Sequence, residues 1–254
     1  MASRALVIIN IGQQESAELA RDLMQRYCRR EGYDFVELRE PKLKIAVPGV
    51  QYSFANLEKF QLYDVLGTYE RVLRLDTDVL VSPLAPDVFR EVPEEALGVV
   101  YEDVGEKVHT RREQMNRIAT ERGGEPWGAR RYFNSGVMVC SRVHRDMFKL
   151  DDEDMAALHS GGMGGFKEQN LCNWKARALG YPLHDLDYRF NHQRFFSDPE
   201  FGGHDRFNSF FLHYAGGKRK RSRRMKRDRA ALLRAWEGGS SPRLTLGDHV
   251  RSLF

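Results

Sequence analysis

The sequence predicts an α/β protein in which helices cover both faces of a central sheet. Short apolar runs alternate with helical patterns through the first half of the chain. The 254 residues are 41% hydrophobic and 30% charged, which is ordinary for a globular chain with a sizeable core. The runs that end at Asn10 and at Asp76 lead into polar residues, and sheets of this class bind ligands at the carboxyl ends of their strands.

The first half supplies most of the predicted sheet. Apolar runs predict strands at residues 5–11, 34–38, 71–75 and 97–102. A helix is predicted over 15–30, because its apolar side chains recur at helical spacing, and a second helix over 55–66.

The second half is less regular. Residues 103–131 are polar and rich in charge and glycine, and predict a loop that contains one short helix. Further along, we expect a strand at 132–141, a helix at 167–180 that ends at Gly180, a strand at 209–217 and a helix through 230–236.

Positive charge is concentrated near the C-terminus. Residues 218–229, KRKRSRRMKRDR, hold nine basic residues and one acidic residue, so the formal net charge of +4 divides into +8 here and −4 elsewhere. We expect one α/β domain over 1–217 and a basic helix and tail over 218–254. Lys218–Arg229 is either a solvated helix face or a site for an anionic membrane surface or an acidic acceptor, and we favour the second. Nucleic acid is not expected, because aromatic residues do not interleave the cations.

Cysteine usage indicates a reducing compartment. Cys28, Cys140 and Cys172 are widely spaced and show no CxxC pattern, so we expect reduced core thiols. The apolar run near the N-terminus is too short for a signal peptide, and no stretch approaches the length of a membrane span. The expected location is cytoplasmic, with peripheral membrane contact as an option.

The stretch RLDTDVLV (74–81) places two aspartates at the end of an apolar run. Taken alone, Asp76 and Asp78 are either turn residues of a strand end or ligands of a cation. His213, at the end of the run SFFLH, is either a core histidine or a third ligand. An imidazole that joins two carboxylates favours Mn²⁺ over Mg²⁺.

Five segments in order resemble the family 8 glycosyltransferases, a group that includes glycogenin and bacterial lipooligosaccharide galactosyltransferases. They are RLDTDVLV (74–81), YFNSGVMV (132–139), KEQNLCN (167–173), DYRFN (187–191) and HYAGGK (213–218). The resemblance covers about residues 4–219. It implies a GT-A fold, a single Rossmann-like α/β/α sandwich with a mixed central sheet. It also implies a UDP-hexose donor, a carbohydrate or other hydroxyl acceptor, Mn²⁺ with Mg²⁺ as the alternative, and sugar transfer with retention of anomeric configuration.

The resemblance also implies donor-binding positions along the chain. Residues of the first strand end and of the aspartate turn would hold the base and ribose: Ile9, Asn10, Ile11 and Thr77. Others would contact the sugar and diphosphate: Lys59, Asp76, Asn134, Ser135, Gly216 and Lys218 or Arg219. The metal ligands would be Asp76, Asp78 and His213. The family's Lys-Pro-Trp after the HxxG element is KRKRS here, and its acidic–Gln–Asp run is Glu168-Gln169-Asn170.

Glu168 and Gln169 are the candidate catalytic residues. By the resemblance, Glu168 accepts hydrogen bonds from sugar hydroxyls and Gln169 lies near the anomeric carbon, where it would stabilise positive charge. In DYRFN, Asp187 and Asn191 are candidates for facing the acceptor. Two alternatives remain: a haloacid-dehalogenase-like phosphatase that uses the DxD motif, and a non-catalytic nucleotide-sugar binding protein.

Overall fold

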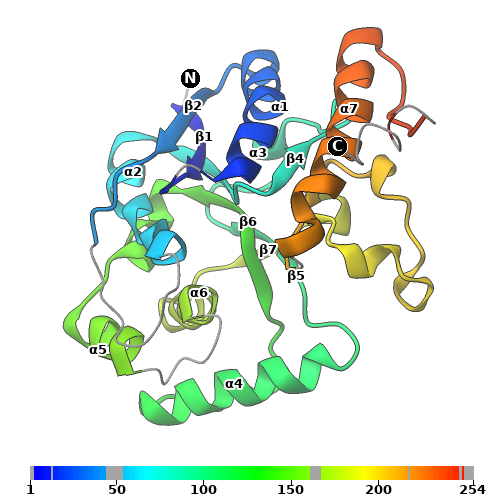
Figure 1. The fold of residues 1–254 in the computed structure, drawn as a ribbon. Coiled ribbons are helices and arrows are strands. Elements are labelled where there is room, and N and C mark those ends of the chain that lie inside the picture. The colour runs from blue at the N-terminus through cyan, green and yellow to red at the C-terminus, as the bar shows by residue number, and fades with distance from the viewer. Residues whose placement is uncertain are drawn as a thin grey trace.

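The computed structural model describes residues 3–12, 14–43, 54–160, 167–216, 218–245 and 248. A six-stranded sheet runs through its centre (Figure 1), in the order β2-β1-β3-β6-β5-β7. Its strands are β1 (Arg4–Ile9), β2 (Asp34–Leu38), β3 (Arg71–Leu75), β5 (Leu97–Tyr101), β6 (Phe133–Ser141) and β7 (Leu183–Asp185). β1 is parallel to β2 and β3, whereas β6 is antiparallel to its neighbours β3 and β5. The prediction of an α/β fold with a mixed sheet is confirmed.

A small antiparallel ribbon continues from the main sheet. It consists of β4 (Val79–Val81) and β8 (Phe211–His213), and it pairs Val79 with His213. Because β4 follows β3 after a short turn, the ribbon brings the end of β8 to the carboxyl end of β3.

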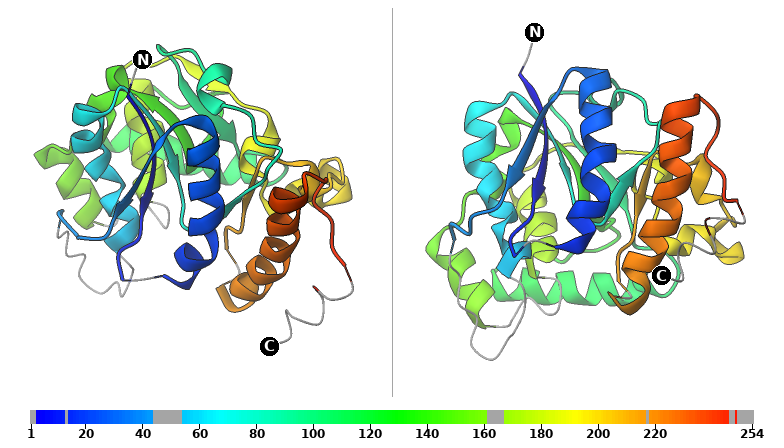
Figure 2. Two further views of the ribbon diagram at one scale, coloured as in Figure 1. Left: turned by 90° about the horizontal axis from the view of Figure 1, so that it is seen from above. Right: turned by 45° about the horizontal axis from the view of Figure 1, so that its top comes forward.

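Helices cover both faces of the sheet (Figure 2). One face packs against α1 (Glu15–Glu31), α3 (Val88–Glu91) and α7 (Lys218–Gly238). The other packs against η1 (Phe54–Gln61), α2 (Leu62–Thr68), α4 (Lys107–Glu121), η2 (Arg142–Phe148), α5 (Asp152–Ser160) and α6 (Lys167–Ala178). Between β7 and β8 the chain forms short 3-10 turns, η4 (Tyr188–Asn191), η5 (Arg194–Ser197), η6 (Pro199–Phe201) and η7 (Arg206–Asn208).

The strand side chains alternate between two hydrophobic clusters, one on each face. In β1, Leu6 and Ile8 join the cluster under α1, and Ala5 and Val7 join the cluster under α2 and α6. This alternation follows from the two-residue period of a strand. It makes β1, β3 and β6 common to both clusters.

Two predicted elements differ from the structure. Residues 103–131 were expected to hold one short helix, but α4 spans 15 residues. Its buried apolar residues are few, chiefly Met115, Ile118 and Ala119, so the apolar stripe is too short to stand out in a charged segment. The strand expected at 209–217 is confined to Phe211–His213, because β4 offers only three residues for pairing and Tyr214 N then bonds to Asp78 O at 3.0 Å.

α7 begins in the basic run, and one face of the helix is buried in the core. Met225, Ala231 and Leu232 are buried in the same cluster as α1, and the indole Nε1 of Trp236 donates to Val81 O at 3.3 Å. A domain boundary at 217/218 stays a prediction, but the second half of α7 is packed as part of the sandwich.

The cysteine prediction is confirmed. Cys28, Cys140 and Cys172 are free and buried, and burial raises the pKa of the Cys28 and Cys172 thiols to about 12. Within the described part of the chain, no helix has the length and apolar composition needed to cross a membrane.

Candidate functional site

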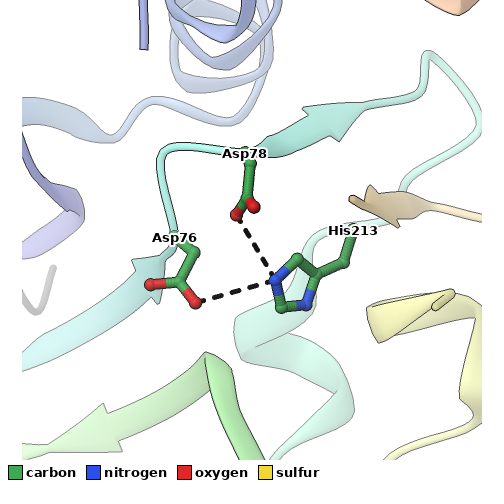
Figure 3. Close-up of side chains that lie close together, drawn as sticks. All are labelled: Asp76, Asp78 and His213. Atoms are coloured by element: carbon green, nitrogen blue, oxygen red, sulfur yellow. Dashed lines mark ion pairs between the residues drawn. The ribbon is translucent and has the colours of Figure 1, made fainter. Parts of the chain in front are cut away.

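The turn between β3 and β4 carries the two aspartates. Asp76 N donates to Gly136 O of β6 at 2.8 Å, and Val79 N donates to Asp76 O at 3.2 Å, so the turn is held from both sides. Because Val79 pairs with His213 across the ribbon, the imidazole lies opposite the turn. Figure 3 shows both carboxylates directed at the same ring nitrogen.

These three side chains form a candidate metal site. His213 Nε2 is 3.6 Å from Asp76 Oδ2 and 3.4 Å from Asp78 Oδ1, and one ligand atom of each residue lies within 4.8 Å of the others. Carboxylate oxygens and ring nitrogens bind a divalent first-row ion at about 2.0–2.2 Å, which brings such atoms to separations of roughly 3 Å. Only a small contraction is therefore needed for the set to hold one ion.

Asn191 fixes the orientation of the imidazole. His213 Nδ1 lies 2.8 Å from Asn191 Oδ1, and the Asn191 amide nitrogen donates to Asn134 Oδ1 at 3.0 Å. The oxygen of Asn191 can only accept, so Nδ1 donates to it and Nε2 faces the two aspartates. One ring nitrogen and two carboxylate oxygens that converge in this way form a ligand set suited to a divalent cation.

The second oxygen of each aspartate contacts a basic residue. Asp76 Oδ1 accepts a hydrogen bond from Arg74 and lies 3.8 Å from Lys59 Nζ, whereas Asp78 Oδ2 is 3.0 Å from Arg221 of α7. Burial raises the pKa of the Asp76 carboxyl, but the charges of Arg74, Lys59 and His213 outweigh it and hold that pKa well below its usual range. Asp76 is therefore ionised at neutral pH and available to a metal.

Gly136 leaves the space in which the site assembles. A Cβ at this position would lie 2.3 Å from His213 Cε1, 2.7 Å from Asp76 Oδ2 and 2.8 Å from Asn134 Oδ1. Any larger residue would therefore displace a candidate ligand.

Lys59 connects the candidate metal site to a second group of polar side chains, which includes Ser135 and Glu168. Its Nζ donates to Ser135 Oγ at 2.9 Å and pairs with Glu168 Oε1 at 3.3 Å, and its side chain is only 3% exposed. A buried ammonium needs partners of this kind. Lys59 is therefore a buried side chain and not part of a solvated helix face.

Gln169 has hydrogen-bond partners at both ends of its amide. Oε1 accepts from Asn134 Nδ2 at 3.1 Å and from Ser135 N at 3.0 Å. Nε2 donates to Glu102 Oε1 and to Tyr132 Oη, both at 3.0 Å. These hydrogen bonds hold the Gln169 amide in one orientation, next to the predicted sugar-binding residues Asn134 and Ser135.

The predicted base and ribose positions lie at the end of β1. Asn10 is buried, donates to Glu37 Oε1 at 2.7 Å and accepts from Gln14 N at 2.9 Å. Thr77 Oγ1 donates to Gln14 Oε1 at 3.1 Å, so this wall is continuous with the aspartate turn. Ile9 is buried and Ile11 is half-buried.

The glycine-rich end of β8 is described in part. Gly216 is exposed and has φ of 72°, a left-handed conformation that suits glycine. The backbone of Lys218 and Arg219 begins α7, but their side chains lie outside the described part of the structure. Which of them contacts a diphosphate therefore stays a prediction.

Sequence reasoning missed four residues of this network: Arg74, Glu102, Asn191 as the partner of His213, and Arg221. Arg74 interrupts the apolar strand RVLRL, and a buried arginine in such a run was an available signal. Glu102 ends the run LGVVYE and is buried beside Arg111, at 2.5 Å, and Asn134, at 2.7 Å. Arg221 gave no signal, because it lies in a run of basic residues.

Known proteins match this chain in structure. No protein-family model and no curated protein matches the sequence. A glycosyltransferase involved in the glycosylation of the major capsid of PBCV-1 is 14% identical with a TM-score of 0.56, and the alignment covers 87% of this chain and 99% of that one. The galactosyltransferase LgtC, solved in complex with donor and acceptor sugar analogs, is 13% identical with a TM-score of 0.56, over 93% of this chain and all of that one.

A third match is the glycosyltransferase GlyE of Streptococcus pneumoniae TIGR4, 15% identical with a TM-score of 0.52; the alignment covers 95% of this chain and 65% of GlyE. At such identities the similarity defines the fold. The chain has the GT-A fold of these glycosyltransferases, and the resemblance to family 8 is confirmed at that level.

Proposed function

We propose that this protein is a metal-dependent glycosyltransferase that moves a hexose from a nucleotide-sugar, most favourably a UDP-hexose, to a hydroxyl acceptor with retention of anomeric configuration. The main support is a continuous series of side-chain contacts. His213 contacts Asp76 and Asp78. Asp76 contacts Lys59, which contacts Ser135 and Glu168. The candidate cation site is thus joined to a cluster of polar side chains, and binding of a sugar-diphosphate would use both.

The metal ligands would hold Mn²⁺, with Mg²⁺ as the alternative. Such an ion supplies Lewis-acid neutralisation of the charge that develops on a diphosphate leaving group. Asp76 and Asp78 contribute carboxylates, and the Nε2 lone pair of His213 favours Mn²⁺ over Mg²⁺.

Each remaining residue has an assigned role. Asn10 and Thr77, with the backbone of Ile9 and Ile11, bind base and ribose. Lys59, Asn134 and Ser135 orient the sugar and its phosphate oxygen, and Gly216 with Lys218 or Arg219 contacts the diphosphate. Glu168 accepts from sugar hydroxyls.

Gln169 is assigned to the anomeric carbon, where its amide dipole stabilises positive charge while the acceptor attacks from the leaving-group side. Because its oxygen also orients Asn134 and Ser135, the role needs a kinetic test. If Gln169→Ala lowers kcat with little change in the donor KM, the residue acts in the transition state. A rise in KM alone makes it a positioning residue.

The remaining proposals concern partners and place. The acceptor is a carbohydrate or another hydroxyl compound. The cations of α7 that face solvent contact an anionic membrane surface or an acidic acceptor. Three reduced core thiols support a cytoplasmic location.

The test measures release of UDP from a panel of UDP-hexoses with Mn²⁺. Wild type should release UDP, EDTA should stop it, and Asp78→Asn should lower the rate about a hundredfold or more. Asp64→Asn is the matched control, because Asp64 is exposed on α2 and, among the described residues, has Lys42 as its ion-pair partner. Product stereochemistry by NMR tests retention.

Two outcomes would replace the proposal. UDP binding without release from any donor would favour a non-catalytic nucleotide-sugar binder. Turnover of p-nitrophenyl phosphate with Mg²⁺ and no response to UDP-sugars would favour the phosphatase.

A further inference from the structure

A cavity of about 600 Å³ lies beside the metal site, between α7 and the turns η5 and η7. Figures 1 and 2 show α7, in orange, next to the yellow segment that carries these turns. We call it the basic cavity. Its lining residues are His192, Arg194, Ser197, Arg206, Leu212, His213, Tyr214, Lys220, Arg224, Arg227 and Asp228. The volume suits a small organic ligand.

The lining carries a large excess of positive charge. Five of the side chains are lysine or arginine, and Asp228 is the one acidic residue among those given above. Asp228 is already neutralised, since its oxygens accept from Arg206 at 2.7 and 3.0 Å and from Arg227 at 2.9 Å. Tyr214 Oη donates to the same carboxylate at 2.8 Å. The acidic residue therefore leaves the other cations of the cavity uncompensated.

Three of those cations have no acidic partner among the described residues. They are Arg194, Lys220 and Arg224. The Nε of Arg224 is buried and, within the part of the chain that the structure describes, has no hydrogen-bond partner. A buried guanidinium nitrogen without a partner is costly, and an anion is the ligand that would satisfy it.

α7 places these cations by its periodicity. Lys220, Arg224 and Arg227 follow one another at spacings of four and three residues, so they share one helix face. On an adjacent face, Arg221 contacts Asp78 at 3.0 Å and Met225 is buried in the core. The same helix thus presents one cation to the metal site and three to the cavity, and His213 takes part in both.

The described donor positions account for one residue of the basic cavity's lining. Among the described side chains assigned above to base, ribose, sugar, diphosphate and metal, His213 is the one that lines it, and the side chains of Lys218 and Arg219 lie outside the described part of the structure. Lys59, Ser135 and Glu168 contact Asp76 or one another from the side of β3 and β6. The segment 192–206 supplies the opposite wall and none of the donor candidates.

We propose that the basic cavity binds a phosphate group of the acceptor, so that the acceptor substrate is a phosphate-bearing hydroxyl compound. This inference rests on the proposed function, because the second ligand of a transferase beside its donor site is the acceptor. Arg194 and Arg224 meet the phosphate from opposite walls with paired N–H groups, and Lys220 adds a third charge.

The test titrates glucose 6-phosphate, with glucose as the uncharged probe, into protein saturated with UDP and Mn²⁺, and measures binding by calorimetry. Glucose 6-phosphate should bind and glucose should not. Arg224→Gln should weaken binding about tenfold or more, the loss expected for one charge-assisted contact. Arg223→Gln is the matched control, because Arg223 is exposed on the same helix and does not line the cavity.

Several results would overturn the inference. Equal binding of glucose would show that charge is not recognised. Equal weakening by Arg223→Gln would show that only the overall charge of α7 matters. Binding of glucose 6-phosphate only in the absence of UDP would make the cavity the donor's own diphosphate site.

The two proposals fail in different ways. If UDP with Mn²⁺ binds and glucose 6-phosphate does not, the phosphate-bearing acceptor is wrong and the transferase proposal is unaffected. If UDP with Mn²⁺ does not bind at all, the proposed function fails, and with it the assignment of the cavity to an acceptor.

Discussion

At the scale of single residues, the candidate metal site depends on a side chain that is not one of the candidate ligands. Asn191 accepts from His213 Nδ1 and so decides which ring nitrogen faces Asp76 and Asp78. Outer partners of this kind commonly change metal affinity by about 10–100-fold when removed. Asn191 was expected from the sequence to face an acceptor, whereas here it lies behind the imidazole and bonds to Asn134.

Replacing Asn191 should therefore weaken metal binding while the three ligands remain. We expect Asn191→Ala to lower the Mn²⁺ affinity about tenfold or more, measured by electron paramagnetic resonance of free Mn²⁺. Asn191→Asp keeps an acceptor for Nδ1 and should restore most of the affinity. Equal affinities for wild type and Asn191→Ala would show that the hydrogen bond does not orient the ring.

A second residue, Glu37, links acid stability to Asn10 in the wall proposed to bind the base. Burial alone would raise the pKa of its carboxyl. Hydrogen bonds from Arg21, Arg39 and Asn10 outweigh burial and lower this pKa to about 2. Because the folded-state pKa lies below the unfolded value, the stabilisation is fully present above about pH 4.5 and is lost as the pH falls toward 2.

Glu37→Gln should thus be less stable than wild type at pH 7, by about 1–3 kcal/mol, a range that allows for solvent screening at the exposed Arg39. The difference should shrink between about pH 4.5 and 2, followed by urea unfolding across this range. A difference that is constant with pH would mean that the carboxylate charge is not what stabilises the fold.

At the scale of elements, the site depends on how closely β6 approaches the turn between β3 and β4. Asp76 N bonds to Gly136 O, and a side chain at Gly136 would collide with His213 and Asp76. Gly98 on β5 is equally crowded, but there the collision is with Val92 and Val139 in the core. Substitutions at Gly136 and Gly98 therefore test the geometry of the candidate site and the packing of the sheet separately.

Gly136→Ala should lose Mn²⁺ binding by about tenfold or more, because the added Cβ displaces the ligands. Gly98→Ala should lower the melting temperature, since overpacking costs about 1–3 kcal/mol, yet retain metal affinity once folded. Thermal unfolding and Mn²⁺ titration on both variants give the comparison. Retained affinity in Gly136→Ala would show that the turn can shift without losing the site.

At the scale of the whole molecule, the sequence predicts the parts whose signal is local. The strands predicted at 34–38 and 71–75 coincide with β2 and β3, because a short apolar run bounded by polar residues can be recognised from local sequence alone. The pair Asp76 and Asp78 was found the same way. The length of α4 was underestimated, because three buried apolar residues in a charged segment give little periodicity.

Contacts between residues far apart in the sequence could not be predicted from local patterns. Only the resemblance joined His213 to the aspartates, 135 residues away by number. Glu102, Asn191 and Arg221 became part of the site through the packing of β5, η4 and α7, and no spacing in the sequence announces such contacts. The basic run likewise showed its charge, but not that Lys220, Arg224 and Arg227 line a cavity.

The sharing of β1, β3 and β6 between the two clusters predicts cooperative unfolding. Cys28 belongs to the cluster under α1, and Cys140 and Cys172 belong to the cluster under α2 and α6. The pKa of each thiol is raised by burial, so the reactive thiolate is scarce until the chain opens. If the helices on one face of the sheet detach, alternate residues of β1, β3 and β6 become exposed. The residues between them pack in the cluster on the other face, so that cluster is weakened as well.

All three thiols should therefore become reactive over one urea transition, the same that circular dichroism records. Pulses of iodoacetamide followed by peptide mass spectrometry read the three sites in a single sample, and fully unfolded protein gives the reference for intrinsic reactivity. Labelling of Cys28 at lower urea than Cys140 and Cys172 would contradict this, because it would mean that the layer of α1 and α7 detaches while the opposite layer stays packed.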